Sequence, residues 1–270
     1  MAVRSSAPRS GRGRGAPAGS AAAPAAGSAA GSAAGSASAP VAASAAVSSA
    51  GRQLVETPAG PAGISWHPAG RPRCVLALGH GAGGGIEARD LAALAAALPA
   101  YGVSVALVEQ PWRVAGKKLA PAPKTLDAGW TALWPALAEP GLPVVAGGRS
   151  AGARVACRTA HELGAAAVLA LSFPLHPPGR PEKSRADELT GAAAVLPLLT
   201  VQGGNDAFGR PAEFPRGRRP VEVPYGDHSF AVPKRAPIGQ DEALAVLTGA
   251  VSDWLAGLGH ASARPAGRKG

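Results

Sequence analysis

The chain has 270 residues and a formal net charge of +10, and its composition excludes two classes of fibrous protein. Glycine follows no three-residue period, which excludes a collagen helix, and no heptad repeat indicates a coiled coil. No run of 18 apolar residues occurs, so we expect no membrane-spanning helix.

The N-terminal segment contains mostly small residues. Residues 1–50 contain 20 Ala, 11 Ser, 7 Gly and 4 Pro. The few large apolar side chains that remain cannot bury enough surface to offset the entropy lost when the segment is ordered. We therefore expect a disordered tail over residues 1–51, one domain over residues 52–259 and a basic tail over residues 260–270. Seven of the 27 cations lie in the tails, so the expected domain is close to neutral.

Strand and helix signals then alternate along the expected domain. Residues 53–57 and 63–67 predict a hairpin. Further strands are expected at residues 74–78, 103–108, 143–146, 166–173, 196–202 and 220–224, and helices at 87–100, 125–137, 151–163 and 241–258. This alternation predicts an α/β fold, a mostly parallel sheet with helices on both faces. Functional sites in such sheets lie at the carboxyl ends of the strands.

The first loop at such an end, GHGAGG at residues 79–84, has two interpretations. A G-x-G-x-x-G pattern after a strand, with Glu109 ending the next strand, is typical of a dinucleotide-binding oxidoreductase. Three consecutive glycines up to Gly85 disfavour a helix that begins there. In a hydrolase the same turn would contribute Gly81 and Ala82 to an oxyanion hole. The oxidoreductase is our third and least favoured function.

Two longer segments are the places where a lid over the site would be expected. Residues 110–124 are short and basic, and residues 174–189 contain four prolines and six charged residues, which predicts a polar surface loop. Without apolar cover, a long acyl chain would gain little from binding. We therefore expect short, soluble acyl groups, with a carboxylate near Arg113, Arg149 or Arg180.

A G-x-S-x-G pattern lies between a predicted strand and a predicted helix, in the sequence GGRSAG at residues 147–152. Small residues on both sides permit the sharp turn that presents a serine hydroxyl, here that of Ser150. The N–H groups at the start of the helix, including that of Ala151, would face a developing oxyanion.

Two later strand ends supply an acid and a base. Asp206 follows the strand at 196–202, and His228 follows the strand at 220–224. The chain order Ser, Asp, His is that of hydrolases with a nucleophile elbow, in which the His takes the proton of the Ser and the Asp orients the His. Asp227 is an alternative acid, disfavoured because sequence neighbours rarely orient each other's side chains well.

Other polar residues give weaker signals. Scattered histidines without ligand spacing predict no metal site, and we expect no cofactor. Trp112 either lines the mouth of the pocket or fills the core. Arg113 and Arg149 either bind an anionic part of the substrate or form ordinary ion pairs.

The tails and the cysteines bear on partners and location. The basic tail residues lack aromatic interleaving, so a solvated tail is favoured over specific nucleic-acid binding. Ser and Gly interrupt the apolar residues of the N-terminal segment too often for a secretory signal. Cys74 and Cys157 lie in predicted core elements, which favours reduced thiols and a cytoplasmic location. The sequence gives no oligomeric state.

Four segments carry a resemblance to a known superfamily. GHGAG at 79–83, EQPWR at 109–113, GGRSAG at 147–152 and FPLHPPG at 173–179 resemble the α/β-hydrolases, and more narrowly the branch of testis-expressed protein 30 and subunit 3 of the NSL histone acetyltransferase complex. The resemblance covers about residues 60–258. It implies an eight-stranded α/β-hydrolase sheet with Ser150 as nucleophile, Asp206 as acid and His228 as base.

These inferences together predict a serine hydrolase. The expected reaction is cleavage of a small soluble ester or thioester through an acyl-enzyme. The alternative is a catalytically quiet interaction module, because the resemblance to the larger relatives also implies a role in complex assembly.

Overall fold

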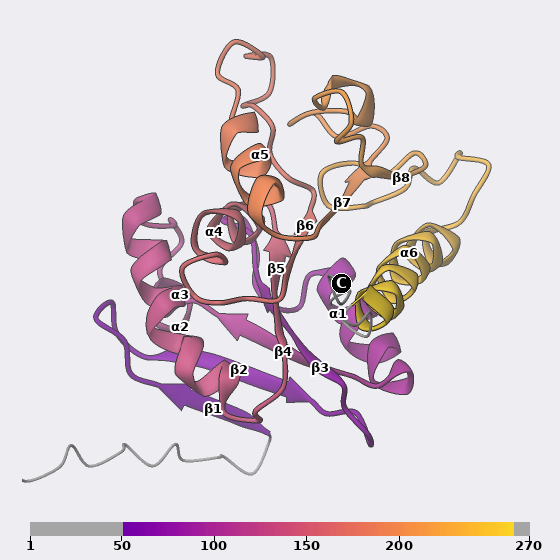
Figure 1. Cartoon of the computed structure of the whole chain (residues 1–270). Coiled ribbons are helices and arrows are strands. Elements are labelled where there is room, and N and C mark those ends of the chain that lie inside the picture. Colours follow the sequence, from indigo (N-terminus) through magenta and orange to yellow (C-terminus); the bar gives the residue numbers. More distant parts are fainter. Residues whose placement is uncertain (1–50, 262–270) are drawn as a thin grey trace, which may run out of the picture. The chain divides into compact units, whose positions relative to one another are not determined.

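The computed structural model describes residues 51–261, and an eight-stranded sheet runs through them (Figure 1). The strand order is β1-β2-β4-β3-β5-β6-β7-β8. The strands are β1 (Arg52–Val55), β2 (Ala62–His67), β3 (Cys74–Gly79), β4 (Val103–Glu109), β5 (Val144–Arg149), β6 (Ala167–Leu171), β7 (Leu198–Gly203) and β8 (Val221–Val223). Of the two predicted tails, residues 1–50 and 262–270 lie outside the described residues.

The pairing of the strands confirms the predicted mostly parallel sheet. β1, β2 and β4 pair antiparallel, whereas β4, β3, β5, β6, β7 and β8 pair parallel with their neighbours. Because β4 lies on one side of β3 and β5 on the other, the chain reverses its direction across the sheet at β3. The carboxyl ends of β3 and β5 therefore lie side by side at a switch point, where α/β sheets bind their ligands.

Helices cover both faces of the sheet. They are α1 (Arg89–Ala97), α2 (Pro111–Val114), α3 (Pro123–Ala138), α4 (Ala151–Thr159), α5 (Ala186–Val195) and α6 (Gln240–Ala261), with 3-10 turns η1 (Leu98–Tyr101) and η2 (Pro211–Glu213). Figure 1 shows α1 and α6 together on one side of the sheet, and α3, α4 and α5 on the other. No helix among residues 51–261 has the length and apolar character needed to cross a bilayer.

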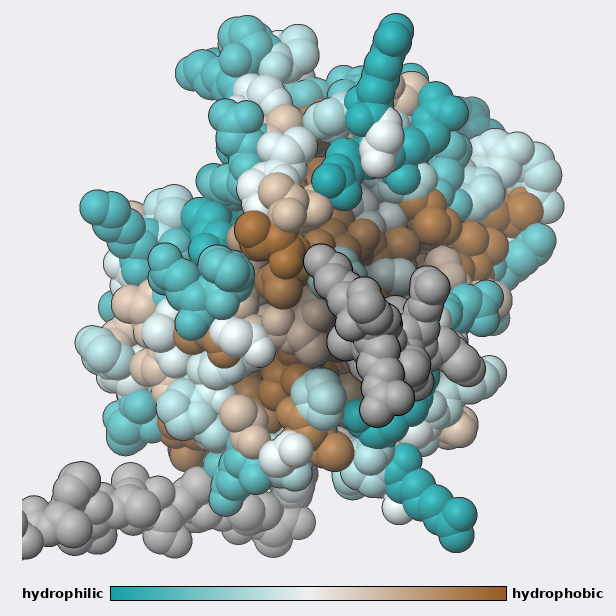
Figure 2. All heavy atoms as spheres, viewed as in Figure 1, coloured by the Kyte–Doolittle hydropathy of each residue, from teal (hydrophilic) through white to brown (hydrophobic). Residues whose placement is uncertain are grey.

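The side chains of the central strands divide the core into two layers. On β3, Val75 and Ala77 pack with α3 and α4, whereas Leu76 and Leu78 pack with α1 and α6. All four are fully buried, as expected for a strand with helices on both sides. In the space-filling view, hydrophobic residues gather toward the middle of the face and hydrophilic residues cover much of its periphery (Figure 2).

Three predicted elements differ from the structure. The helix expected at 87–100 is divided into α1 and η1, because Pro99 cannot donate the hydrogen bond that an α-helix requires. The helix expected at 151–163 ends at Thr159. The polar surface loop expected at 174–189 is confirmed only over exposed residues 178–184, because the segment begins with buried Leu175 and ends in α5, whose Leu189 is fully buried.

Candidate active site

Ser150 lies on a strained turn between β5 and α4. Its backbone has φ 51° and ψ −112°, a conformation that few residues other than glycine adopt. The turn lies so close to the end of β3 that an added Cβ at Gly148 would be 2.5 Å from the carbonyl oxygen of Gly79, and at Gly152 it would be closer still. The two glycines of the G-x-S-x-G pattern thus allow the turn to pack against β3.

The structure brings Ser150, His228 and Asp206 together from three strand ends. Nε2 of His228 is 2.9 Å from Oγ of Ser150, and its Nδ1 is 2.8 Å from Oδ2 of Asp206. These distances fit a chain in which Nδ1 donates to the carboxylate and Nε2 accepts from the hydroxyl. In such a chain a base can take the proton of a serine hydroxyl while a carboxylate orients the base.

The Asp206 carboxylate is fully buried and held by several donors. The backbone N–H of Phe208 donates to Oδ1 at 2.8 Å, and the side-chain amide of Gln202 donates to Oδ2 at 2.8 Å. The ring of Phe208 stacks on His228 with a centroid separation of 4.1 Å. The loop after β7 therefore fixes both the carboxylate and the plane of the imidazole.

Asp227, the alternative acid, has a different environment. Its Oδ1 accepts hydrogen bonds from the backbone N–H groups of Ser229 and Ala231 and from the Ser229 hydroxyl. Burial alone would raise the pKa of Asp227, but these hydrogen bonds outweigh it and lower the pKa. Asp227 thus stabilises the turn that carries His228, while Asp206 contacts the imidazole.

His80 connects the glycine-rich loop to the end of β4. Its Nδ1 donates to the carbonyl of Gly81 at 2.8 Å, and its Nε2 accepts from the backbone N–H of Gln110 at 3.1 Å. This pattern requires a neutral ring with the proton on Nδ1, and burial lowers the pKa of His80 in agreement. The sequence predicts neither this tautomer nor the two hydrogen bonds, because the partners of His80 are backbone atoms.

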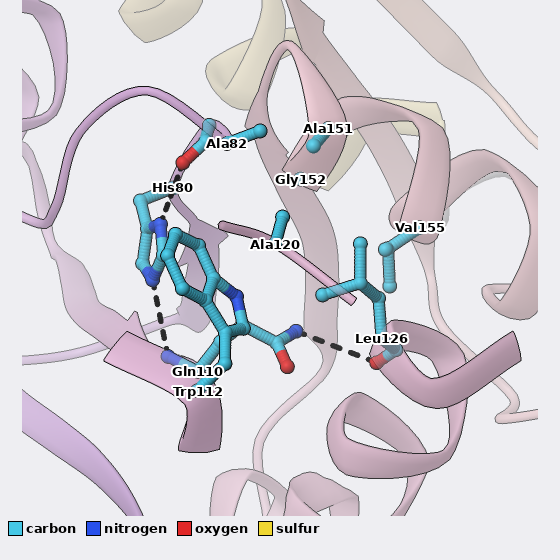
Figure 3. Close-up of a pocket in the computed structure, with 10 residues that line it drawn as sticks. His80, Ala82, Gln110, Trp112, Ala120, Leu126, Ala151, Gly152 and Val155 are labelled. Atoms are coloured by element: carbon cyan, nitrogen blue, oxygen red, sulfur yellow. Dashed lines mark hydrogen bonds between the residues drawn. The ribbon is translucent and has the colours of Figure 1, made fainter. Parts of the chain in front are cut away.

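A pocket beside Ser150 contains all three residues predicted for the oxyanion hole. The pocket is small, and Figure 3 shows the side chains around it. The polar end is formed by His80, Gly81, Ala82 and Ala151, and the apolar walls by Trp112, Ala120, Leu126 and Val155. Trp112 both lines this pocket and belongs to the core, which unites the two roles considered for it.

Arg149 is buried beneath the site, so the structure corrects its expected contact with substrate. Its Nη2 donates to the backbone carbonyl of His228 at 2.7 Å, and its Nε donates to Oδ2 of Asp90 at 3.1 Å. An added Cβ on Gly81 would lie 3.1 Å from Nη1. Arg149 therefore contacts the loop that carries His228 and lies against the loop with the residues predicted for the oxyanion hole, which is the geometry of a positioning residue.

Arg113 and Glu109 form ion pairs within the protein. Arg113 pairs with Glu87 at 3.4 Å near the surface, whereas Arg52 of β1 binds the carboxylate of Glu109. Glu109 is the residue that would bind a ribose in the dinucleotide interpretation, and α1 begins only at Arg89, five residues after Gly84. Both observations disfavour a dinucleotide site.

Other reactive groups are remote from the site or inert. Burial raises the pKa of the Cys157 thiol to about 12, so this residue fills the core and is not a nucleophile. Within residues 51–261, no group of three or more His, Cys, Asp or Glu side chains is arranged to hold a metal ion.

Comparison with known proteins identifies the family. Residues 72–256 match the family model described as an alpha/beta hydrolase domain. A comparison with curated proteins gives no match.

Several solved structures share the fold. XC6422 from Xanthomonas campestris, described as an α/β serine hydrolase without a lid, is 18% identical with a TM-score of 0.57, and the match covers 75% of this chain and 94% of that one. The dienelactone hydrolase of Anabaena variabilis is 21% identical with a TM-score of 0.53, covering 79% and 96%. Est1E from Butyrivibrio proteoclasticus is 15% identical with a TM-score of 0.53, covering 76% and 99%.

Proposed function

Because the chain belongs to the α/β-hydrolase domain family, we propose that it is a serine hydrolase that cleaves a small soluble ester or thioester. The observation that carries this proposal is the continuous contact from Ser150 Oγ through the His228 imidazole to the Asp206 carboxylate. A serine on a strained turn, in contact with a base that a buried carboxylate orients, is the arrangement that activates a hydroxyl.

The proposed reaction has two halves. Oγ of Ser150 attacks the substrate carbonyl carbon while its proton passes to Nε2 of His228. The resulting oxyanion accepts hydrogen bonds from the backbone N–H groups of Ala82 and Ala151, and Gly81 shapes the turn. His228 then protonates the departing alcohol or thiol, which leaves an acyl-enzyme. Water attacks that ester, gives its proton to His228, and releases the acid as Ser150 recovers its proton.

An activity-based probe tests the nucleophile. A fluorophosphonate forms a phosphonate ester with an activated serine and expels fluoride, so we expect labelling of the protein and its loss in Ser150→Ala. Ser229→Ala is the matched control, because Ser229 lies beside His228 and hydrogen-bonds only to Asp227 among the described residues. Folded protein that takes up no label would contradict the proposal and favour the interaction module.

The pocket also supports a limit on acyl length. The pocket is small and offers only a few apolar side chains, so each methylene beyond the first few would remain in water and gain less than the ~0.8 kcal/mol of full burial. With p-nitrophenyl esters from acetate to palmitate, we expect kcat/KM to be highest at four carbons or fewer. An increase in kcat/KM for acyl chains longer than eight carbons would contradict this expectation.

Two finer assignments belong to the same proposal. The segments around residues 79, 109, 147 and 173 support membership of the branch of testis-expressed protein 30 and NSL complex subunit 3. The two free, buried thiols, Cys74 and Cys157, support a cytoplasmic location.

A further inference from the structure

The segment FPLHPPG, residues 173–179, lies in the loop after β6 and has no part in the chemistry proposed above. It is hydrogen-bonded to the loop after β7, which carries the proposed acid. The backbone N–H of His176 donates to the carbonyl of Phe208 at 3.0 Å. The side-chain amide of Gln202 donates to the carbonyls of Phe173 at 3.2 Å and of Gly209 at 2.9 Å. The position of one loop therefore depends on the other.

The ring of His176 adds a further connection between these loops. Its Nδ1 lies 2.9 Å from the backbone carbonyl oxygen of Pro177, and its Nε2 lies 2.9 Å from Oε2 of Glu213 in η2. A carbonyl and a carboxylate only accept hydrogen bonds, so each ring nitrogen must carry a proton and the ring is an imidazolium. A neutral ring would place a lone pair against one of the two oxygens. His176 is 6% exposed, so water can hardly replace the lost hydrogen bond.

The charges around His176 agree with a protonated ring. The hydrogen bond to the carbonyl of Pro177 raises the pKa of His176 and Glu213 raises it further, against the opposing effects of burial and of Arg185 at the start of α5. The pKa of Glu213 is lowered, first by the backbone N–H of Arg210, which donates to Oε1 at 2.8 Å, and then by His176. The two side chains therefore form an ion pair up to a higher pH than an ordinary histidine would allow.

Glu213 ends a segment that begins with a residue in contact with the proposed acid and base. Phe208 donates its backbone N–H to Oδ1 of Asp206 at 2.8 Å, and its ring stacks on His228. The backbone of His176 holds this segment at Phe208, and the ring of His176 holds it at Glu213. Deprotonation of the ring breaks the second connection, and the segment is then free to move Phe208 away from the imidazole that it orients.

We propose that the His176 imidazolium, through Glu213, is a positioning residue for the loop that carries Asp206. The inference rests on the proposed function, which gives Asp206 and His228 their roles. His228 must be neutral to accept a proton, whereas His176 must be charged to hold the loop. The connection is present below the folded-state pKa of His176 and is lost as pH rises through it. We therefore expect kcat/KM to rise with pH as His228 loses its proton and to fall again as His176 does.

Substitutions of Glu213 test the proposal through this alkaline fall. The amide of Glu213→Gln can donate to Nε2 of a neutral His176, and its oxygen can still accept from the backbone N–H of Arg210. For p-nitrophenyl acetate, we expect kcat/KM of the unmodified protein to fall about fivefold at alkaline pH, the scale of one lost hydrogen bond, and that of Glu213→Gln to stay level. Glu213→Ala lacks the connection at every pH and should be slow throughout, mainly through kcat. Glu182→Gln, at an exposed position in the loop after β6, is the matched control and should retain the fall.

A measurement without turnover separates this inference from the proposed function. In ¹⁵N NMR spectra of Ser150→Ala protein, both ring nitrogens of His176 should stay protonated above the pKa of a histidine in a short peptide, and should titrate at lower pH when Glu213→Gln is added. Hydrolysis with the same alkaline fall in Glu213→Gln, or a His176 ring that titrates like a peptide histidine, would overturn the positioning role and leave the proposed function intact. Absence of ester hydrolysis by the unmodified protein would overturn both, even with His176 protonated.

Discussion

Asp206→Asn should lower kcat/KM for p-nitrophenyl acetate by about 10⁴ and leave the protein folded. The amide keeps the shape of the side chain, but its NH₂ group cannot accept the Nδ1 proton of His228. The imidazole then adopts the other tautomer, with the proton on Nε2, and cannot take a proton from Ser150. Circular dichroism should show unchanged secondary structure, because the amide retains the oxygen that the backbone N–H of Phe208 contacts.

Asp227→Asn is the matched control for this change. The residue lies in the same loop as His228, and an asparagine oxygen can still accept the hydrogen bonds from Ser229 and Ala231. We therefore expect kcat/KM within a few-fold of the unmodified protein. If Asp227→Asn lowered kcat/KM more than Asp206→Asn did, the assignment of Asp206 as the acid would be wrong.

The sequence predicts most of this fold because its signals are local. The apolar runs at β3, β4 and β6 mark fully buried strands, and the glycines at 148 and 152 mark a turn that must pack closely against a neighbouring strand. α5 was missed because its ten residues, ADELTGAAAV, have a weak apolar stripe and follow a segment rich in proline and charge. Leu189 and Ala192 are buried in the core layer that also contains α4.

The site residues that sequence analysis missed act through distant partners. Gln202, inside β7, holds Asp206, and Phe208 stacks on His228, which is twenty residues further along the chain. Arg149 lies beside a strand-end loop and was expected either to bind substrate or to form an ion pair, and its partners are Asp90 and the carbonyl of His228. No local pattern indicates pairs 59 and 79 residues apart, so only the folded chain shows them.

The Arg149–Asp90 pair leads to the second large effect, on both stability and rate. Both side chains are less than a tenth exposed, and removing one partner from a buried ion pair leaves an uncompensated charge at a cost of ~3–5 kcal/mol. For a domain of this size, Arg149→Met should lower Tm by on the order of 10 °C. The variant also releases the carbonyl of His228, so we expect kcat to fall more than KM rises.

Two further comparisons test why Arg149→Met lowers stability and rate. Asp90→Leu combined with Arg149→Met removes both charges, and this double variant should be more stable than Arg149→Met alone. In His228→Ala protein, Arg149→Met should lower the residual rate no further, because a residue that acts through the imidazole has no effect once the imidazole is absent. An equal loss of rate in both backgrounds would show that Arg149 has only a structural role.

The stability of Arg149→Met should also depend on pH, and the ionisation of Asp90 determines the direction of that dependence. Burial raises the pKa of this carboxyl, and the Arg149 charge is the main opposing influence. Without Arg149 the folded-state pKa rises further above the unfolded value, so folding favours the protonated acid and stability falls as pH rises through the folded pKa. The deficit in Tm relative to the unmodified protein should therefore be smaller at pH 5 than at pH 8. A deficit independent of pH would mean that lost packing, and not the buried carboxylate, destabilises the variant.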